Sequence, residues 1–186
     1  VAVAVFAGRI WHAFANPVSS QIGSGSGHLA SLNSSNRWRW WQEAWHAFLR
    51  HPGGGTGGGT FQITDAMLHQ SPLVTTEPHN VPLQFLSETG IVGFLLLVAA
   101  AIAAAIGATL ARVRAGGAER AAVTALALGV AVFLVHLVGD TDWDYLGTCG
   151  PLLFAAGALL ARGRPAAEAA PARRRLLAVA AVLFAC

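Results

Sequence analysis

One histidine and its neighbours form the most suggestive chemical group in this 186-residue sequence. His79 lies between Pro78 and Asn80, and Pro82 follows shortly after. Asn80 and Pro82 predict the start of a helix, because asparagine is a favoured N-cap and proline fits the first turn. His79 would then lie beside a helix N-terminus, which favours an anion. An imidazole there could act as a general base or donate to a leaving group; alternatively, it only helps to cap the helix.

Arginines are the candidate ligands for an anionic substrate group. A guanidinium is suited to bidentate contact with phosphate oxygens, and an outward-facing enzyme of the bilayer would meet phosphate in lipid carriers. Arg37 is one of the arginines of the predicted outer face that could make such a contact. The alternative is that Arg37 only places a guanidinium among the indoles of an interfacial helix. We expect a further set of polar residues to bind substrate: Arg39, Arg50, Asn80 and Asp140.

The sequence does not predict a metal site. The segment from Asp140 to Asp144 resembles the opening of a calcium loop, but Tyr145 and Pro151 occupy the positions that require glycine and glutamate. A cluster at a helix end, pairing with an arginine of the long loop, is the better interpretation. His46 and His51 are five residues apart and share a helix face poorly. We expect no metal and no cofactor.

The composition is typical of a membrane protein. Hydrophobic residues make up 54% of the chain and charged residues 11%, with a mean hydropathy of +0.53; soluble domains carry roughly 25% charged residues. The pI is near 9.7, but eight of the twelve arginines flank apolar runs, which indicates membrane topology and no nucleic-acid partner. The cysteines, Cys149 and Cys186, predict neither a disulfide framework nor a zinc site.

Three apolar segments predict transmembrane helices, at about 91–111, 121–138 and 145–161. Gly107, four residues before Ala111, would permit close helix packing in the first. The third is short and interrupted by Gly150-Pro151. His136, in the second span, is either a functional group within the membrane or a neutral histidine bonded to a neighbouring helix.

The two ends of the sequence predict incomplete spans, at residues 1–8 and 176–186, so we expect a piece of a larger multi-span protein. The loops at 112–120 and 162–175 hold three and five arginines, and the loop at 139–144 holds none. Because basic loops stay in the cytoplasm, the long loop at 9–90 is predicted to be extracytoplasmic.

The long loop should contain short helices. From Asn36, a predicted N-cap, to Arg50, aromatic residues recur every three or four positions, which predicts an amphipathic helix at the lipid boundary or against the bundle. Asn16–Ser35 should be irregular, and Gln62–Gln70 a short helix. The glycine run at 53–59 lacks the strand and Gly-Lys-Ser/Thr of a nucleotide site and is better interpreted as a turn that allows close backbone approach.

Three blocks of this sequence resemble the O-antigen ligase and O-antigen polymerase superfamily of bacterial membrane glycosyltransferases. The first is Arg37–Trp45 followed by His51-Pro52 and the glycine run to Phe61. The second, the more specific, is His79-Asn80-x2-Leu83-Gln84-x-Leu86-x-Glu88-x-Gly90-Ile91-x-Gly93. The third is His136–Asp144, with its Asp-x-Asp-Trp segment. Together they cover roughly residues 36–161.

This resemblance implies an all-α, polytopic, GT-C-like helical bundle in the cell membrane with a large extracytoplasmic loop. It also implies metal-independent glycan transfer from an undecaprenyl-pyrophosphate carrier to a glycan, lipid or protein acceptor. By motif match, Arg37 would hold the pyrophosphate and His79 would activate the acceptor hydroxyl. The glycine run is longer than the family pattern and the spans before it are absent, so the chain could be inactive alone. A transporter or flippase fragment and a non-catalytic membrane protein are the alternatives.

Overall fold

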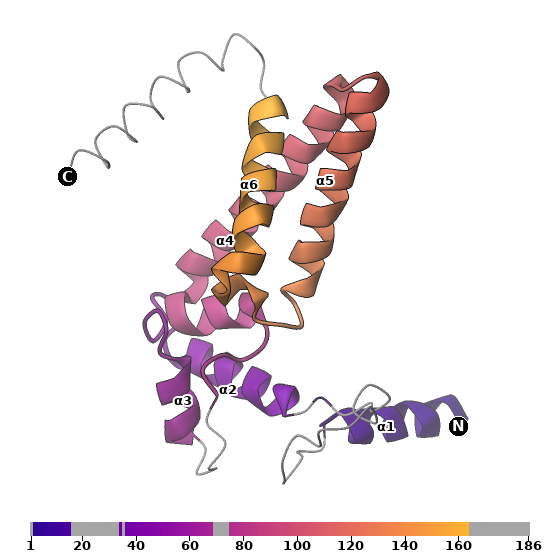
Figure 1. Cartoon of the computed structure of the whole chain (residues 1–186). Coiled ribbons are helices and arrows are strands. Elements are labelled where there is room, and N and C mark those ends of the chain that lie inside the picture. Colours follow the sequence, from indigo (N-terminus) through magenta and orange to yellow (C-terminus); the bar gives the residue numbers. More distant parts are fainter. Residues whose placement is uncertain (1, 16–33, 35, 69–74, 164–186) are drawn as a thin grey trace, which may run out of the picture. The chain divides into compact units, whose positions relative to one another are not determined.

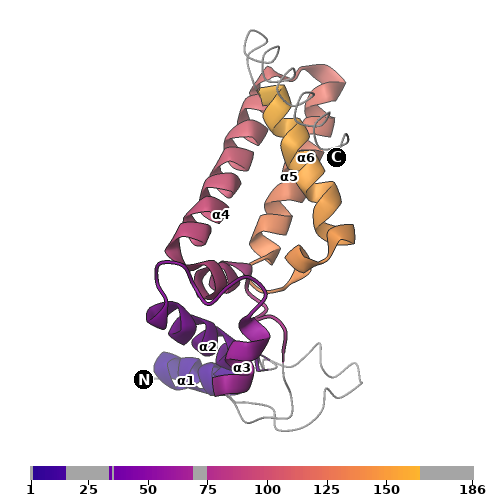
Figure 2. The ribbon, with the colours of Figure 1, turned by 90° about the vertical axis from the view of Figure 1, so that its left-hand side faces the viewer.

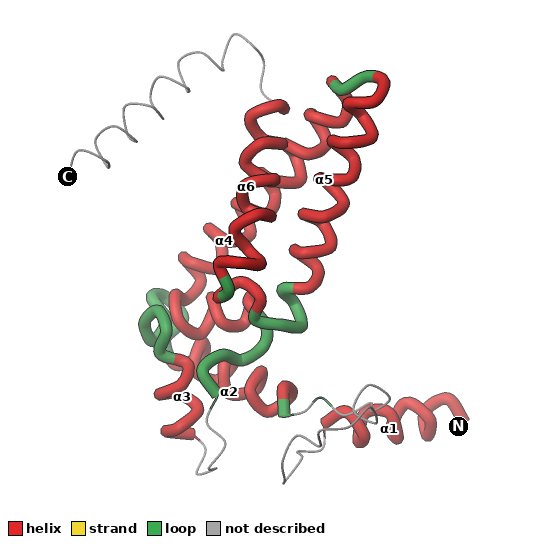
Figure 3. The backbone as a smooth tube through the Cα atoms, in the orientation of Figure 1, coloured by secondary structure: helices red, strands yellow, loops and turns green. Residues whose placement is uncertain are grey.

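The structure is a computed structural model that describes residues 2–15, 34, 36–68 and 75–163. Within these ranges it contains helices and no strand, which confirms the all-α prediction (Figures 1 and 3). Two compact units divide the chain: residues 1–97 with 137–141, and residues 98–136 with 142–186. The helices are α1 (Ala2–Ala15), α2 (Arg37–Arg50), α3 (Phe61–Leu68), α4 (Val81–Arg114), α5 (Gly117–His136) and α6 (Leu146–Gly163), with a short 3-10 helix, η2 (Asp142–Asp144).

The first helix is longer than the sequence indicates. A span ending near residue 8 is predicted, whereas α1 continues past Arg9 and Trp11 to Ala15. Most of the predicted irregular loop that follows, residues 16–33 and 35, lies outside the described residues. The predicted incomplete span at 176–186 and most of the arginine-rich loop at 162–175 also lie outside them.

The second helix begins at the predicted residue and Asn36 occupies the predicted N-cap position, but its side chain does not cap the helix. Asn36 adopts a left-handed conformation (φ 73°), and its side chain makes no capping hydrogen bond. Ser34 caps the helix instead. Its carbonyl oxygen accepts from the Arg37 N–H at 3.0 Å, and its hydroxyl oxygen accepts from the Trp38 N–H at 3.4 Å. A serine two residues earlier can reach these free N–H groups because the left-handed residue turns the chain back.

The glycine run packs against the first half of α4. The Thr56 and Gly57 N–H groups donate to the Ser87 and Glu88 carbonyl oxygens at 2.9 and 2.8 Å. Gly55 has φ +70°, and a Cβ there would lie 2.2 Å from the Glu88 carbonyl carbon. The run therefore needs glycine for close backbone approach, as the sequence predicts.

A kink at Gly90 divides α4 into a short amino-terminal helix and the first long apolar helix. Gly90 adopts φ 65° and ψ −165°, which is open to glycine and strained for other residues. At the kink the Ile91 N–H does not lack a partner, because it donates to the Pro52 carbonyl oxygen at 2.8 Å. The predicted start of the span at residue 91 coincides with this kink.

Among the described residues, three helices are long and apolar enough to cross a membrane: α4, α5 and α6. α5 begins four residues before the predicted position and ends at His136, and α6 accommodates Pro151 within the helix. In the second unit α5 and α6 lie side by side (Figures 1 and 2). A Cβ on Gly107 would lie 2.8 Å from the Leu160 Cα atom, and this confirms the predicted close helix packing at Gly107.

Candidate functional site

His79 occupies a constrained position just before α4. Its backbone has φ 53°, a left-handed conformation that is uncommon outside glycine and recurs at functional sites. Its imidazole Nδ1 lies 3.3 Å from the Asp140 Oδ1 atom. The Trp40 indole stacks on the imidazole, with ring centroids 5.3 Å apart and an interplanar angle of 24°. The ring is thus held at one nitrogen and over one face.

Asn80 performs the capping role that the sequence predicts. The Leu83 N–H donates to the Asn80 Oδ1 atom at 2.9 Å, as an N-cap requires. The Asn80 Nδ2 group donates to the Val138 carbonyl oxygen at 2.7 Å, and the Val81 N–H donates to the Leu137 carbonyl oxygen at 2.9 Å. Asn80 is 7% exposed, so its amide ties the segment before Asp140 to the start of α4.

Arg37 reaches the same carboxylate from α2. Its NH1 group donates to the Gly139 carbonyl oxygen at 2.8 Å, and its NH2 atom lies 3.6 Å from the Asp140 Oδ2 atom. Arg37 and His79 therefore face different oxygens of one carboxylate. We call Arg37, Trp40, His79 and Asp140 the Asp140 cluster. The predicted pairing of the acidic run with an arginine of the long loop is present.

The electrostatics of the Asp140 cluster favour an ionised carboxylate. Partial burial alone would raise the pKa of Asp140, but the Thr141 backbone N–H, His79 and Arg37 together lower that pKa below its ordinary value. The Thr141 N–H donates at 2.8 Å to Oδ1, the oxygen that faces His79. An ionised Asp140 favours the His79 tautomer with its proton on Nδ1, which leaves the Nε2 lone pair available as a base.

Arg39 belongs to a different cluster. Its Nε atom lies 3.4 Å from the Glu43 Oε1 atom, and its NH2 atom lies 3.9 Å from the Asp65 Oδ1 atom in α3. Glu43 and Asp65 are 6% and 1% exposed. The Thr75 N–H also donates to Asp65, at 3.1 Å. The structure thus places the Arg39 guanidinium between two buried acids that join α2 to α3.

The buried acid Glu43 should make folding pH-dependent. Burial, followed by the hydrogen bond to Asp65 and its negative charge, raises the pKa of Glu43 to about 8 from an ordinary 4.5, against the opposing charge of Arg39. Because the folded state holds this proton more tightly, the contribution of Glu43 to stability is complete below pH 4.5 and is lost as the pH rises toward 8.

We therefore expect Glu43→Gln, which stays neutral, to weaken this loss. The measurement is the thermal unfolding midpoint of the intact protein between pH 5 and pH 8, within the window set by the two pKa values. Glu77→Gln, an acid before α4, is the control. An equal pH slope in wild type and Glu43→Gln would contradict the argument.

Arg50 lies at the opposite end of α2 from Arg37. Thirteen residues along an α-helix correspond to about 20 Å, so one small headgroup cannot touch both guanidiniums. The structure brings Arg37, His79 and Asp140 together and leaves Arg50 exposed at the helix C-terminus.

The second unit contains a separate histidine–aspartate pair. The His136 Nδ1 atom lies 3.0 Å from the Asp142 Oδ2 atom, so its partner is a residue of η2 and not, as the sequence suggests, a neighbouring helix. In the part of the chain that the structure describes, no three His, Cys, Asp or Glu side chains gather as metal ligands.

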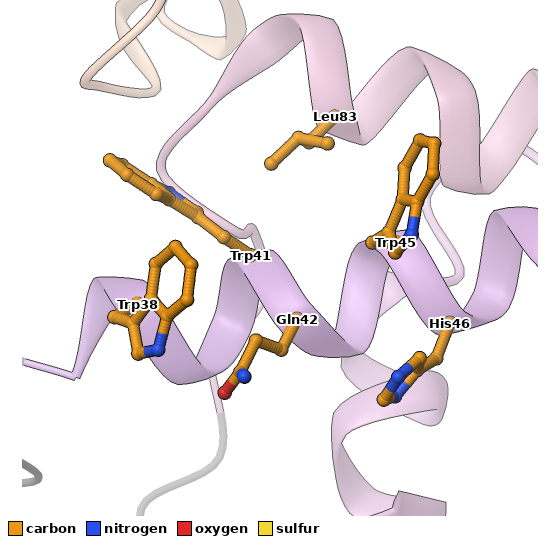
Figure 4. A pocket seen from close by; sticks show the side chains of 6 residues that line it. All are labelled: Trp38, Trp41, Gln42, Trp45, His46 and Leu83. Atoms are coloured by element: carbon orange, nitrogen blue, oxygen red, sulfur yellow. The ribbon is translucent and has the colours of Figure 1, made fainter. Parts of the chain in front are cut away.

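Two features of the first unit are not foreseen from the sequence. One is the stacking of Trp40 on His79. The sequence indicates only that Trp40, three residues after Arg37, lies on the same side of the helix as Arg37. The other is a cavity of about 370 Å³ on α2 (Figure 4), lined by Trp38, Trp41, Gln42, Trp45, His46 and Leu83.

Comparison with known proteins supplies an independent observation. A family model described as O-antigen ligase matches residues 1–98, slightly more than half of the chain. The match contains Arg37, His79 and Asn80. No curated protein and no solved structure matches the chain.

Proposed function

Because this chain belongs to the O-antigen ligase family, we propose that it transfers a glycan from an undecaprenyl-pyrophosphate carrier to an acceptor hydroxyl at the extracytoplasmic face of the membrane. The observation that carries this proposal is the meeting of Arg37 and His79 at Asp140. An imidazole and a guanidinium, 42 residues apart in sequence, converge there, and these are groups suited to proton transfer and to diphosphate binding.

The chemistry divides between the two side chains. His79 Nε2 accepts the proton of the acceptor hydroxyl as its oxygen forms a bond to the anomeric carbon of the donor sugar. The bond between this carbon and the phosphate oxygen breaks, and undecaprenyl pyrophosphate leaves with the electron pair. Arg37 stabilises the charge that develops on this leaving group. The Arg37 side chain is 37% exposed, so a ligand can reach it.

Asp140 has a positioning role in this proposal. A carboxylate repels a diphosphate, so direct substrate binding by Asp140 is less favourable than the sequence alone suggests. Its two oxygens instead face Arg37 and His79. This is the general logic of a carboxylate that orients a histidine base and stabilises the imidazolium that forms. Asn80 supports the arrangement by fixing the segment before Asp140.

The orientation follows from charge. The α4–α5 connection is flanked by Arg112 and Arg114 in the last turn of α4 and by Arg120 in the first turn of α5, whereas the α5–α6 connection contains acidic residues and no arginine. Positive-inside bias assigns the first connection to the cytoplasm. The segment before α4, which contains His79, then belongs to the extracytoplasmic side, where a lipid-linked donor delivers its glycan.

A transfer assay with the intact protein in proteoliposomes tests this function. We expect wild type to transfer glycan from an undecaprenyl-pyrophosphate donor, and Arg37→Ala to lower the rate by about 10²- to 10³-fold, the usual effect of removing one group that stabilises transition-state charge. Arg112→Ala, which removes an arginine from the last turn of α4, is the matched control and should transfer glycan at the wild-type rate. Normal transfer by Arg37→Ala would exclude the proposed role.

A further inference from the structure

The cavity on α2 has the size and lining of a small-molecule site. Its volume of about 370 Å³ lies within the range of pockets that hold small ligands. Three indoles, those of Trp38, Trp41 and Trp45, form its apolar walls, and Leu83 of α4 faces them (Figure 4). The Gln42 amide and the His46 imidazole project from the same helix.

The chemistry of the lining defines its ligand. None of the six lining residues carries a permanent charge, so the ligand should be neutral. Indole faces favour contact with C–H groups, whereas the exposed Gln42 and His46 side chains both donate and accept hydrogen bonds. A sugar ring has this combination, with C–H groups on its faces and hydroxyls around its edge. An isoprenoid chain would use the indoles and gain nothing from the two polar groups.

The indole walls are held in place before any ligand binds. The Trp38 and Trp41 rings lie 6.4 Å apart at 73°, which makes a corner. Trp11 of α1 packs edge-on against Trp38 at 4.7 Å, and Phe14 packs against Trp41 at 6.1 Å. Aromatic contacts on the α1 side therefore support two of the three walls, and a preformed wall lowers the entropic cost of binding.

We propose that this cavity binds one neutral sugar unit of a glycan substrate. The proposal rests on the proposed function only for the source of the sugar. Trp38 directly follows Arg37 on α2, so a sugar bound here lies on the helix whose first residue is the proposed phosphate ligand. The cavity would then contribute to affinity and specificity for the glycan, whereas the Asp140 cluster would carry out the transfer.

Saturation-transfer NMR on the intact protein in lipid nanodiscs tests the site without any donor lipid. The probes are D-galactose, D-mannose and N-acetyl-D-glucosamine. We expect saturable signals on the ring C–H protons of at least one sugar, about tenfold weaker binding in Trp45→Ala and a smaller loss in Gln42→Ala. Phe6→Ala, which removes an exposed aromatic side chain from α1, is the matched control and should bind as wild type does.

Three results would overturn the proposal: no saturable sugar binding, equal binding in wild type and Trp45→Ala, or saturable binding of farnesol alone, which would assign the cavity to an isoprenoid chain. The variant His79→Ala separates this proposal from the proposed function. It should bind sugar with unchanged affinity even though it is expected to lose transfer. Sugar binding by a wild-type protein that transfers no glycan would support the cavity and contradict only the transferase role.

Discussion

His79→Ala is expected to lower the rate of glycan transfer by about 10²- to 10⁴-fold, the usual contribution of a general base. The physical reason is the arrangement of the imidazole. Asp140 engages Nδ1, Trp40 covers one face, and the left-handed backbone sets the direction of the side chain. Alanine removes the only group of this arrangement that can accept the acceptor proton at Nε2. The measurement is the initial transfer rate in proteoliposomes at saturating donor.

His51→Ala provides the matched control for this experiment. His51 follows α2 and is exposed, so its loss removes an imidazole from the same unit without touching the Asp140 cluster. Asp140→Asn tests the positioning role, because it keeps the shape and removes the charge that selects the tautomer. If His79 and Asp140 act as one unit, the double variant should be no slower than His79→Ala. Transfer by His79→Ala at the rate of His51→Ala would exclude the proposed base.

Gly55→Ala is expected to destabilise the first unit by about 2–6 kcal/mol. Two costs add. The residue has φ +70°, which strains any side chain, and the new Cβ would lie 2.2–2.4 Å from the backbone of Glu88 and Thr89. Backbone atoms cannot move away as a flexible side chain can. The helix α3 should be affected as well, because the Glu88 carboxylate caps it by accepting from the Gly59 and Phe61 N–H groups, each at 3.0 Å.

Gly54→Ala is the matched control, one residue away in the same run. No atom lies within 4 Å of a Cβ at this position, and its backbone is not left-handed. The measurement is the thermal unfolding midpoint of both variants in the same lipid. Equal midpoints for Gly55→Ala and Gly54→Ala would show that the glycine run does not pack against α4 as closely as the structure describes.

The spans and one helix start were predictable because their signals are local. Residues 91–111 form an uncharged apolar run, and this run alone requires a helix in lipid. Asn80 and Pro82 likewise mark the start of α4 through the backbone preferences of two neighbouring residues. Asn36 also occupies an N-cap position, but it adopts a left-handed conformation without side-chain capping, and Ser34 supplies the hydrogen bonds. Residue type alone did not distinguish these two cases.

The sequence by itself determined that this is an all-α membrane chain, where its apolar helices run, and which residue types could carry phosphate and proton chemistry. Only the tertiary structure decided which of those residues act together. Arg37 and Arg39 are two positions apart, about 200° around one helix, so one reaches Asp140 and the other is buried with Glu43 and Asp65. The helical period predicts that the Arg37 and Arg39 side chains point to different sides of α2. Which residues lie on each side depends on how distant segments of the chain pack against the helix.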